Sequence, residues 1–167
     1  YYVCNECFSI FRGDNNLRDP FSEEYFNYDM ARHCSRRNNR NRELTKLVGE
    51  IYDASATFTV CDFGASDGSL LLEIKRDFPK ASMVGIDLKL DTLIRNGADA
   101  FHTMEEAFDR HNIDLLISSN TLLYTDYEEF VSILQKRKPS NVILTGPNHL
   151  IRPVQLFYDD VITNASP

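Results

Sequence analysis

The sequence predicts an α/β fold built on a doubly wound, mainly parallel β-sheet. Five short apolar segments with the composition of buried strands alternate with segments whose apolar residues recur at helical spacing. A turn with two glycines, from Asp62 to Gly68, joins the first of these strands to a helix. In sheets of this kind ligands bind at the carboxyl ends of the strands, so we expect the functional residues in the turns that follow them.

The strands are expected at residues 58–62, 81–86, 98–102, 113–117 and 141–145. Helices are expected at residues 30–53, 69–77 and 91–96, followed by two that begin with capping boxes. The boxes pair Thr103 with Glu106 and Thr125 with Glu128, so that side chains satisfy free N–H groups of the first turn. In the first helix, apolar residues at i, i+3, i+4 and i+7 predict the buried face: Leu44, Leu47, Val48 and Ile51.

Residues 1–30 are expected to form a small irregular N-terminal segment, ahead of an α/β domain at residues 31–167 with its core at 57–146. Cys4 and Cys7 in this segment form a CxxC pair, a spacing that can supply two of the four ligands of a zinc ion. Such a zinc knuckle needs a second pair of ligands, which we expect upstream of Tyr1. Reduced thiols without a metal and a redox pair stay open as alternatives.

The net charge of −7 argues against broad nucleic-acid binding, which needs a positive face. Basic residues nevertheless cluster in one stretch: Arg32, Arg36, Arg37, Arg40, Arg42 and Lys46. This stretch is either a solvated helix face or a clamp for an anionic substrate, so nucleic acid stays open as a disfavoured partner. No apolar run has the length of a membrane span, and four cysteines without a disulfide pattern indicate a cytoplasmic setting.

The acidic residues around the turn indicate the charge of its ligand. Asp62 and Asp67 lie in the turn, and Asp87 follows the second strand, where an acid can accept both hydroxyls of a ribose. A dinucleotide such as NAD requires a bare glycine turn, because two carboxylates repel a diphosphate. They suit a ligand with an amino or sulfonium cation, which favours S-adenosylmethionine over NAD.

The segments VCDFGASDGSLL and VGIDLK resemble motif I and the acidic second-strand motif of class I S-adenosylmethionine-dependent methyltransferases. The resemblance covers about residues 45–150 and implies a Rossmann-like fold with S-adenosylmethionine as cofactor. The residues that it implies at the methionine part are Asp62, Gly64, Ala65, Ser66 and Gly68. It further implies that Asp87 holds the ribose and Leu88 flanks the adenine. The remaining implied contacts are Thr103 near the adenine edge, and Ser119 and Asn120 beside cofactor and substrate.

The N-terminal segments YYVCNECFSIF and SEEYFNYD resemble the zinc-knuckle segment that precedes the catalytic domain in some bacterial methyltransferases. Two departures from the family pattern keep other functions open. Ser66 replaces the middle glycine of the motif, and the sequence is expected to lack the C-terminal strand pair of the fold.

The expected function is methyl transfer to an unidentified acceptor. A small molecule, sugar or lipid is favoured, because residues 118–121 are not the Asn/Asp-Pro-Pro-Tyr of base amino-methyltransferases. The alternatives are a non-catalytic, methyltransferase-like binding module and, less favoured, an NAD-dependent oxidoreductase. Tyr124, His149 and His102 are candidate general bases by their position, and the sequence selects none of them. It gives no prediction of the oligomeric state.

Overall fold

The computed structural model describes residues 2–3, 10–11 and 34–146 of the chain. The chain divides into two compact units, Tyr1–Arg40 and Asn41–Pro167. In the first unit, a short antiparallel pair joins β1 (Tyr2–Val3) to β2 (Ile10–Phe11).

Cys4 and Cys7 lie between these two strands in the sequence and outside the described residues. Zinc binding by this pair therefore stays a prediction, as does the domain boundary at residues 30–31. Among the residues that the structure does describe, no group of three or more His, Cys, Asp or Glu side chains is arranged to hold a metal ion.

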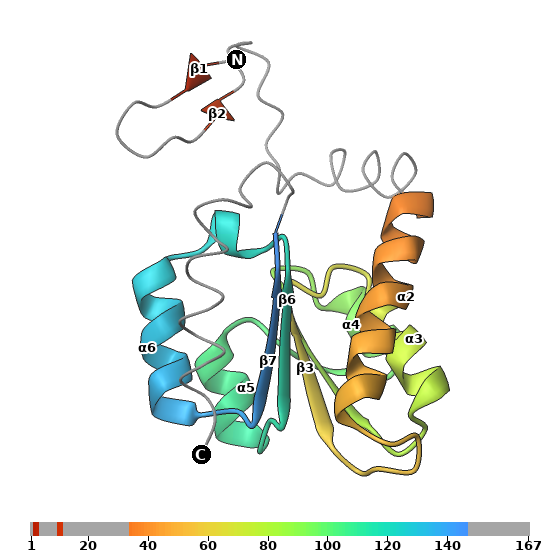
Figure 1. Cartoon of the computed structure of the whole chain (residues 1–167). Helices are drawn as coiled ribbons and strands as arrows, with labels where there is room; N and C mark the ends of the chain where they lie inside the picture. The colour runs from red at the N-terminus through yellow and green to blue at the C-terminus, as the bar shows by residue number, and fades with distance from the viewer. Residues whose placement is uncertain (1, 4–9, 12–33, 147–167) are drawn as a thin grey trace. The chain divides into compact units, whose positions relative to one another are not determined.

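The second unit contains a five-stranded sheet in which every strand is parallel to its neighbours. The strands are β3 (Thr59–Phe63), β4 (Ser82–Ile86), β5 (Asp99–Phe101), β6 (Leu115–Ser119) and β7 (Asn141–Thr145). Their order across the sheet is β5-β4-β3-β6-β7 (Figure 1). The central strand β3 has β4 on one side and β6 on the other, so the strand order reverses beside it. The predicted doubly wound parallel sheet is confirmed.

Helices cover both faces of this sheet (Figure 1). The helices on one face are α2 (Cys34–Ile51), α3 (Ser69–Asp77) and α4 (Asp91–Arg95). Those on the other face are α5 (Met104–Arg110) and α6 (Tyr127–Arg137), and the 3₁₀ turn η1 (Leu122–Tyr124) precedes α6. None of the helices in the described part is both long enough and apolar enough to cross a lipid bilayer.

The core consists of two layers, one on each face of the sheet, because side chains alternate along a strand. In β3, Val60 faces the α2–α3 layer and Cys61 the α5–α6 layer. In β6, Leu115 and Ile117 face the first layer and Leu116 the second. Burial raises the pKa of the Cys61 thiol well above its ordinary value, and the neighbouring Asp62 carboxylate adds to the shift. Cys61 is therefore a neutral residue of the core.

The buried face of α2 differs from the predicted one. Leu44 and Val48 are buried, but Leu47 and Ile51 are each 41% exposed. The face that packs on the sheet consists of Asn41, Leu44, Thr45 and Val48. The periodicity of the apolar residues missed it because two of its four members, Asn41 and Thr45, are polar. Asn41 bonds to Ser69, whereas the buried Thr45 hydroxyl has no hydrogen-bond partner among the described residues.

The start of α6 also differs from the prediction. Asp126 is the N-cap, and its Oδ1 accepts hydrogen bonds from the N–H groups of Glu128 at 2.9 Å and Glu129 at 3.1 Å. The Thr125 hydroxyl instead donates to the carbonyl of Leu122 at 3.3 Å. The carboxylate is the stronger acceptor at a helix N-terminus, since it also has a favourable interaction with the helix dipole. The capping box of Thr103 with Glu106 is confirmed.

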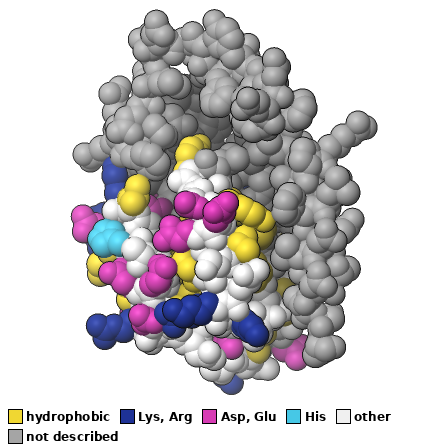
Figure 2. All heavy atoms as spheres, turned by 90° about the vertical axis from the view of Figure 1, so that its left-hand side faces the viewer, with side chains coloured by type: hydrophobic (Ala, Val, Ile, Leu, Met, Phe, Trp, Pro, Cys, Tyr) yellow, Lys and Arg dark blue, Asp and Glu magenta, His cyan; other side chains and the backbone are white. Residues whose placement is uncertain are grey.

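Helices α5 and α6 carry acidic residues in the first turn and basic residues in the last. On the face formed by these helices, most of the acidic side chains therefore lie above most of the basic ones (Figure 2). This separation complements the dipoles of the helices and needs no ligand to explain it.

Neighbouring leucines of α3 provide a test of the first core layer. Leu71 is 1% exposed and Leu72 is 43% exposed. We expect Leu71→Ala to lower the free energy of unfolding by about 2–5 kcal/mol, because it removes buried surface and leaves a cavity. The matched control Leu72→Ala should cost less than about 1 kcal/mol, since its side chain is largely hydrated already. Urea denaturation measures both, and equal losses would contradict the packing described for α3.

Candidate functional site

The candidate site lies at the carboxyl edge of the sheet, where the turn after β3 sits between the segments that follow β4 and β6. The register places Phe63 opposite Ile86 of β4 and Ser118 of β6, so β3 and β4 end at the same level and β6 continues for one more residue. The strand order reverses at this point, which is the position where open α/β sheets bind ligands.

Left-handed backbone conformations make the turn after β3 tight. Gly64 has φ of +82°, Ser66 of +53° and Gly68 of +75°. Ser66, which stands where the family motif has glycine, thus keeps a glycine-like conformation at a cost of about 1–2 kcal/mol. One carbonyl oxygen of β4 holds the turn in place: the N–H groups of Gly64 and Ala65 both donate to the Ile86 carbonyl, at 2.8 and 3.0 Å.

Asp87, which follows β4, is bonded to this turn through its side chain. Its Oδ2 accepts a hydrogen bond from the N–H of Ser66 at 2.8 Å, and its Oδ1 accepts one from the N–H of Lys89 at 3.2 Å. Each carboxylate oxygen has a second lone pair with which it can accept another donor. The next residue, Leu88, is 64% exposed and so offers an apolar surface beside the carboxylate.

Thr121 follows β6, in a segment where the sequence predicts functional residues, but sequence reasoning did not single it out. A Cβ atom built on Gly64 would lie 1.8 Å from the Thr121 Oγ1, 2.5 Å from its Cγ2 and 2.7 Å from its Cβ. These distances leave no room for any side chain at position 64. The glycine is therefore required by this close approach as well as by its positive φ. The sequence carries no signal for the contact, because Thr121 lies on another strand's turn.

The two acidic residues of the turn have different surroundings. Asp62 lies in β3 and is 4% exposed. Asp67 lies in the turn, where its Oδ1 accepts a hydrogen bond from the N–H of Ser69 at 3.1 Å, at the start of α3. Its carbonyl accepts another from the Asn96 side chain at 2.8 Å, which fixes the turn to the end of α4. A carboxylate thus already occupies part of the N-terminus of α3.

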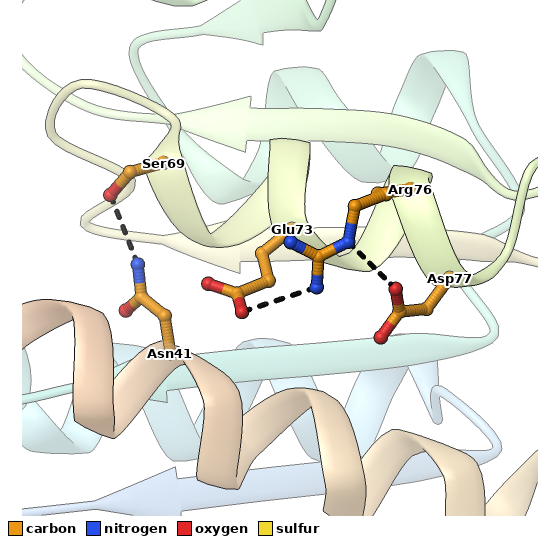
Figure 3. Close-up of polar contacts among 5 residues, drawn as sticks. All are labelled: Asn41, Ser69, Glu73, Arg76 and Asp77. Carbon is orange, nitrogen blue, oxygen red and sulfur yellow. Dashed lines mark hydrogen bonds and ion pairs between the residues drawn. The ribbon is translucent and has the colours of Figure 1, made fainter.

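Helix α2 is also bonded to the start of α3, through a side-chain hydrogen bond (Figure 3). The buried Asn41 side chain donates from Nδ2 to the Ser69 Oγ at 3.0 Å. Further along α3, Arg76 lies between two carboxylates, bonded to Asp77 at 2.9 Å and to Glu73 at 3.4 Å (Figure 3). The Asn41 bond explains why a polar residue occupies the buried face of α2.

Comparison with models of protein families gives no match, and neither does comparison with curated proteins. Solved structures do match in fold. The plantazolicin methyltransferase BpumL, in complex with a monoazolic desmethylPZN analog and SAH, aligns with a TM-score of 0.52 at 19% identity, over 66% of this chain and 46% of that one. Its complex with a triazolic analog and SAH gives a TM-score of 0.51 over the same shares.

The fold is that of the class I methyltransferases. A third match, to a candidate O-methyltransferase from Nostoc punctiforme PCC 73102, has a TM-score of 0.49 at 23% identity and covers 64% of this chain and 36% of that one. This chain spans less than half of the length of BpumL, since the match covers 46% of it.

Within this methyltransferase fold, Ser119 and Asn120 belong to a turn that β7 holds in place. The Thr145 hydroxyl donates to the Ser119 Oγ at 2.8 Å, and the N–H of Asn120 donates to the Thr145 carbonyl at 2.9 Å. Asn120 has φ of +62°, so the chain turns sharply as β6 ends. Ser118, two residues before Asn120, is fully buried, and no partner for its hydroxyl lies among the described residues.

No described contact connects Thr103, one of the predicted cofactor residues, to the turn. It follows β5, the edge strand of the sheet, and β4 separates it from β3. Its Oγ1 accepts a hydrogen bond from the N–H of Glu106 at 3.3 Å, which caps α5. The described contacts give it a structural role at the helix start.

The two candidate general bases within the described residues lie at exposed positions. Tyr124 lies in η1 and is 59% exposed, and His102 is also exposed. The backbone N–H of His102 donates to Glu106 at 3.2 Å, which again belongs to the start of α5. His149 lies outside the described residues.

Two glycines with similar backbone conformations test the contact of Gly64 with Thr121. Gly97 has φ of +78° and no atom within 4 Å of its missing Cβ, whereas Gly64 has Thr121 there. We expect Gly97→Ala to cost about 1–2 kcal/mol of unfolding free energy from backbone strain alone. Gly64→Ala should cost about 1–3 kcal/mol more, because the new methyl group overlaps Thr121.

Combining Gly64→Ala with Thr121→Gly should recover the larger part of that additional cost, since the overlapping side chain is gone. Urea denaturation of the single and double variants measures the coupling. If Gly64→Ala and Gly97→Ala cost the same, the contact between the two turns is not as described.

Proposed function

We propose that this chain binds S-adenosylmethionine at the carboxyl edge of its sheet and transfers the methyl group to a small-molecule, sugar or lipid acceptor. The observation that carries the proposal is the bonding of Asp87 to the turn after β3, through the N–H of Ser66 at 2.8 Å. This bond places the acid beside a glycine turn at the point where the strand order reverses. The likeness in fold to BpumL, solved in complex with SAH, supports the same cofactor class.

The residues present fit this cofactor at its nucleoside end. The Asp87 carboxylate is oriented by two backbone N–H groups and keeps acceptor capacity for the two hydroxyls of a ribose. Leu88, exposed at the next position, can cover one face of the adenine. Because the carboxylate is already fixed in the structure, little side-chain entropy is lost when it accepts the ribose.

The state of the turn disfavours a dinucleotide. Four of its backbone N–H groups and the first one of α3 already donate to acceptors within the chain: those of Gly64, Ala65, Ser66, Gly68 and Ser69. A diphosphate needs such groups free, and it would also lie next to the Asp67 carboxylate at the start of α3. The acidic turn suits the amino group and sulfonium of S-adenosylmethionine instead.

S-adenosylmethionine supplies a methyl group on a sulfonium, and in the transfer the acceptor's lone pair forms the new bond while the C–S electron pair stays on sulfur. The contribution of the chain is to position the donor and to exclude water. Asp87 orients the nucleoside end, and the other end lies on the acidic turn. An acceptor that is neutral before the reaction loses one proton, and we assign no residue to receive it.

The segment after β6 supports an acceptor other than a nucleic-acid base. Residues 118–121 read Ser-Ser-Asn-Thr and lack the stacking aromatic of the base amino-methyltransferase motif. A non-catalytic module with the same fold would share the cofactor site and differ only in turnover. The positive φ of Ser66 favours a site that still binds, because it is a conformation that glycine also adopts readily.

Substitution of Asp87 tests the cofactor site. We expect Asp87→Asn to weaken the binding of S-adenosylhomocysteine by about 1–3 kcal/mol, because the ribose hydroxyls lose a charged acceptor. The matched control is Asp91→Asn, which changes the net charge equally at an exposed position in the first turn of α4. It should leave the affinity within about twofold, and titration calorimetry measures both.

The same titration on the unmodified chain decides between the functions. Heat with S-adenosylmethionine and S-adenosylhomocysteine but not with NAD is the expected result. Absence of heat with both adenosyl ligands would overturn the proposed function, and heat with NAD alone would favour an oxidoreductase. Binding without methyl transfer to any of a panel of acceptors would favour the non-catalytic module.

A further inference from the structure

Thr121 lies against the turn on the side opposite to Asp87. All three of its side-chain heavy atoms lie within 2.7 Å of the place where a Cβ of residue 64 would be. Its side chain therefore rests on the open face of Gly64. Because β4 and β6 flank β3 on opposite sides, Asp87 and Thr121 mark the two sides of the turn.

The Thr121 hydroxyl is only weakly engaged within the chain. Its Oγ1 donates to the Ser119 carbonyl at 3.4 Å, well beyond the usual O–H···O distance of about 2.7–2.8 Å. A ligand acceptor at normal distance can therefore take this hydrogen with little loss of internal bonding.

The position of Thr121 is nevertheless fixed. Its own carbonyl accepts a hydrogen bond from the N–H of Tyr124 at 2.9 Å, and Thr121 is the N-cap of η1. On its other side, Asn120 is bonded to the Thr145 carbonyl of β7 at 2.9 Å. The backbone around the hydroxyl is thus held by β7 and η1, so the donor is presented to the turn without first having to be ordered.

The turn itself has few donors to offer a carboxylate. The N–H groups of Gly64, Ala65, Ser66, Gly68 and Ser69 are committed to acceptors in the chain. An anionic group that lies on Gly64 therefore needs a side-chain donor, and the Thr121 hydroxyl already touches that glycine.

The geometry points to Thr121 as the donor that binds the carboxylate at the amino-acid end of the ligand, while Asp87 binds the nucleoside end. This inference rests on the proposed function and deepens it, because it divides the site into two subsites on either side of the turn. Thr121 is thus a specificity-determining residue: it favours an adenosyl ligand that carries an amino-acid chain over one that lacks it.

The test compares Thr121→Ser with Thr121→Ala in the whole chain. Both variants remove the methyl group, and only the second also removes the hydroxyl. Each is titrated with S-adenosylhomocysteine, which has the amino-acid end, and with 5′-methylthioadenosine, which lacks it. We expect Thr121→Ala to lower the affinity for S-adenosylhomocysteine roughly tenfold, as for the loss of one hydrogen bond to a charged group. Thr121→Ser should stay within about twofold, and 5′-methylthioadenosine should bind both variants equally.

Thr125→Ala is the control, because its hydroxyl bonds only to Leu122 among the described residues, and neither ligand should be affected. Thermal unfolding confirms that each variant is folded. The role of Thr121 would be overturned if the serine and alanine variants lost the same affinity for S-adenosylhomocysteine, or if neither lost any. It would also be overturned if the affinity for 5′-methylthioadenosine fell in parallel. Absence of binding of either ligand to the unmodified chain would instead overturn the proposed function, and this inference with it.

Discussion

The tight turn after β3 depends on being held from both sides. The Asp87 carboxylate binds it through the N–H of Ser66, and Thr121 occupies the space where a Cβ of Gly64 would be. Since β4 and β6 carry these two residues, their positions follow from the strand order of the sheet. The shape of the site is therefore a consequence of how the sheet is assembled and not of the turn alone.

This arrangement changes the usual chemistry of a helix N-terminus beside a glycine turn. Such a terminus normally presents free N–H groups to an anion. Here Asp67 takes the N–H of Ser69, and Ile86 takes those of Gly64 and Ala65. A site with its backbone donors in use and carboxylates around it suits a ligand with positive charge near the turn, and it leaves side chains to bind any negative group.

Much of the fold could be predicted because local signals agreed with the tertiary environment. The inner strands β3, β4 and β6 are largely buried on both faces, as a sheet covered on both sides requires. The Thr103 capping box closes within its own turn. Prediction failed where polar side chains have partners remote in sequence. Asn41 belongs to the buried face of α2 because Ser69 accepts its hydrogen bond, and periodicity based on leucines could not include it. Asp126 caps α6 instead of the predicted Thr125, because its carboxylate is the better acceptor.

For the site, the sequence by itself determined the residue types of the turn: glycines where φ is positive, two acids, and Asp87 after the next strand. These are local requirements of backbone conformation and charge, so they are readable along the chain. Only the tertiary structure decided what touches the turn. The register between β3 and β6 brings Thr121 onto Gly64, and the edge position of β5 leaves Thr103 two strands away from β3. Contacts of this kind depend on how strands are ordered in space, which no local pattern encodes.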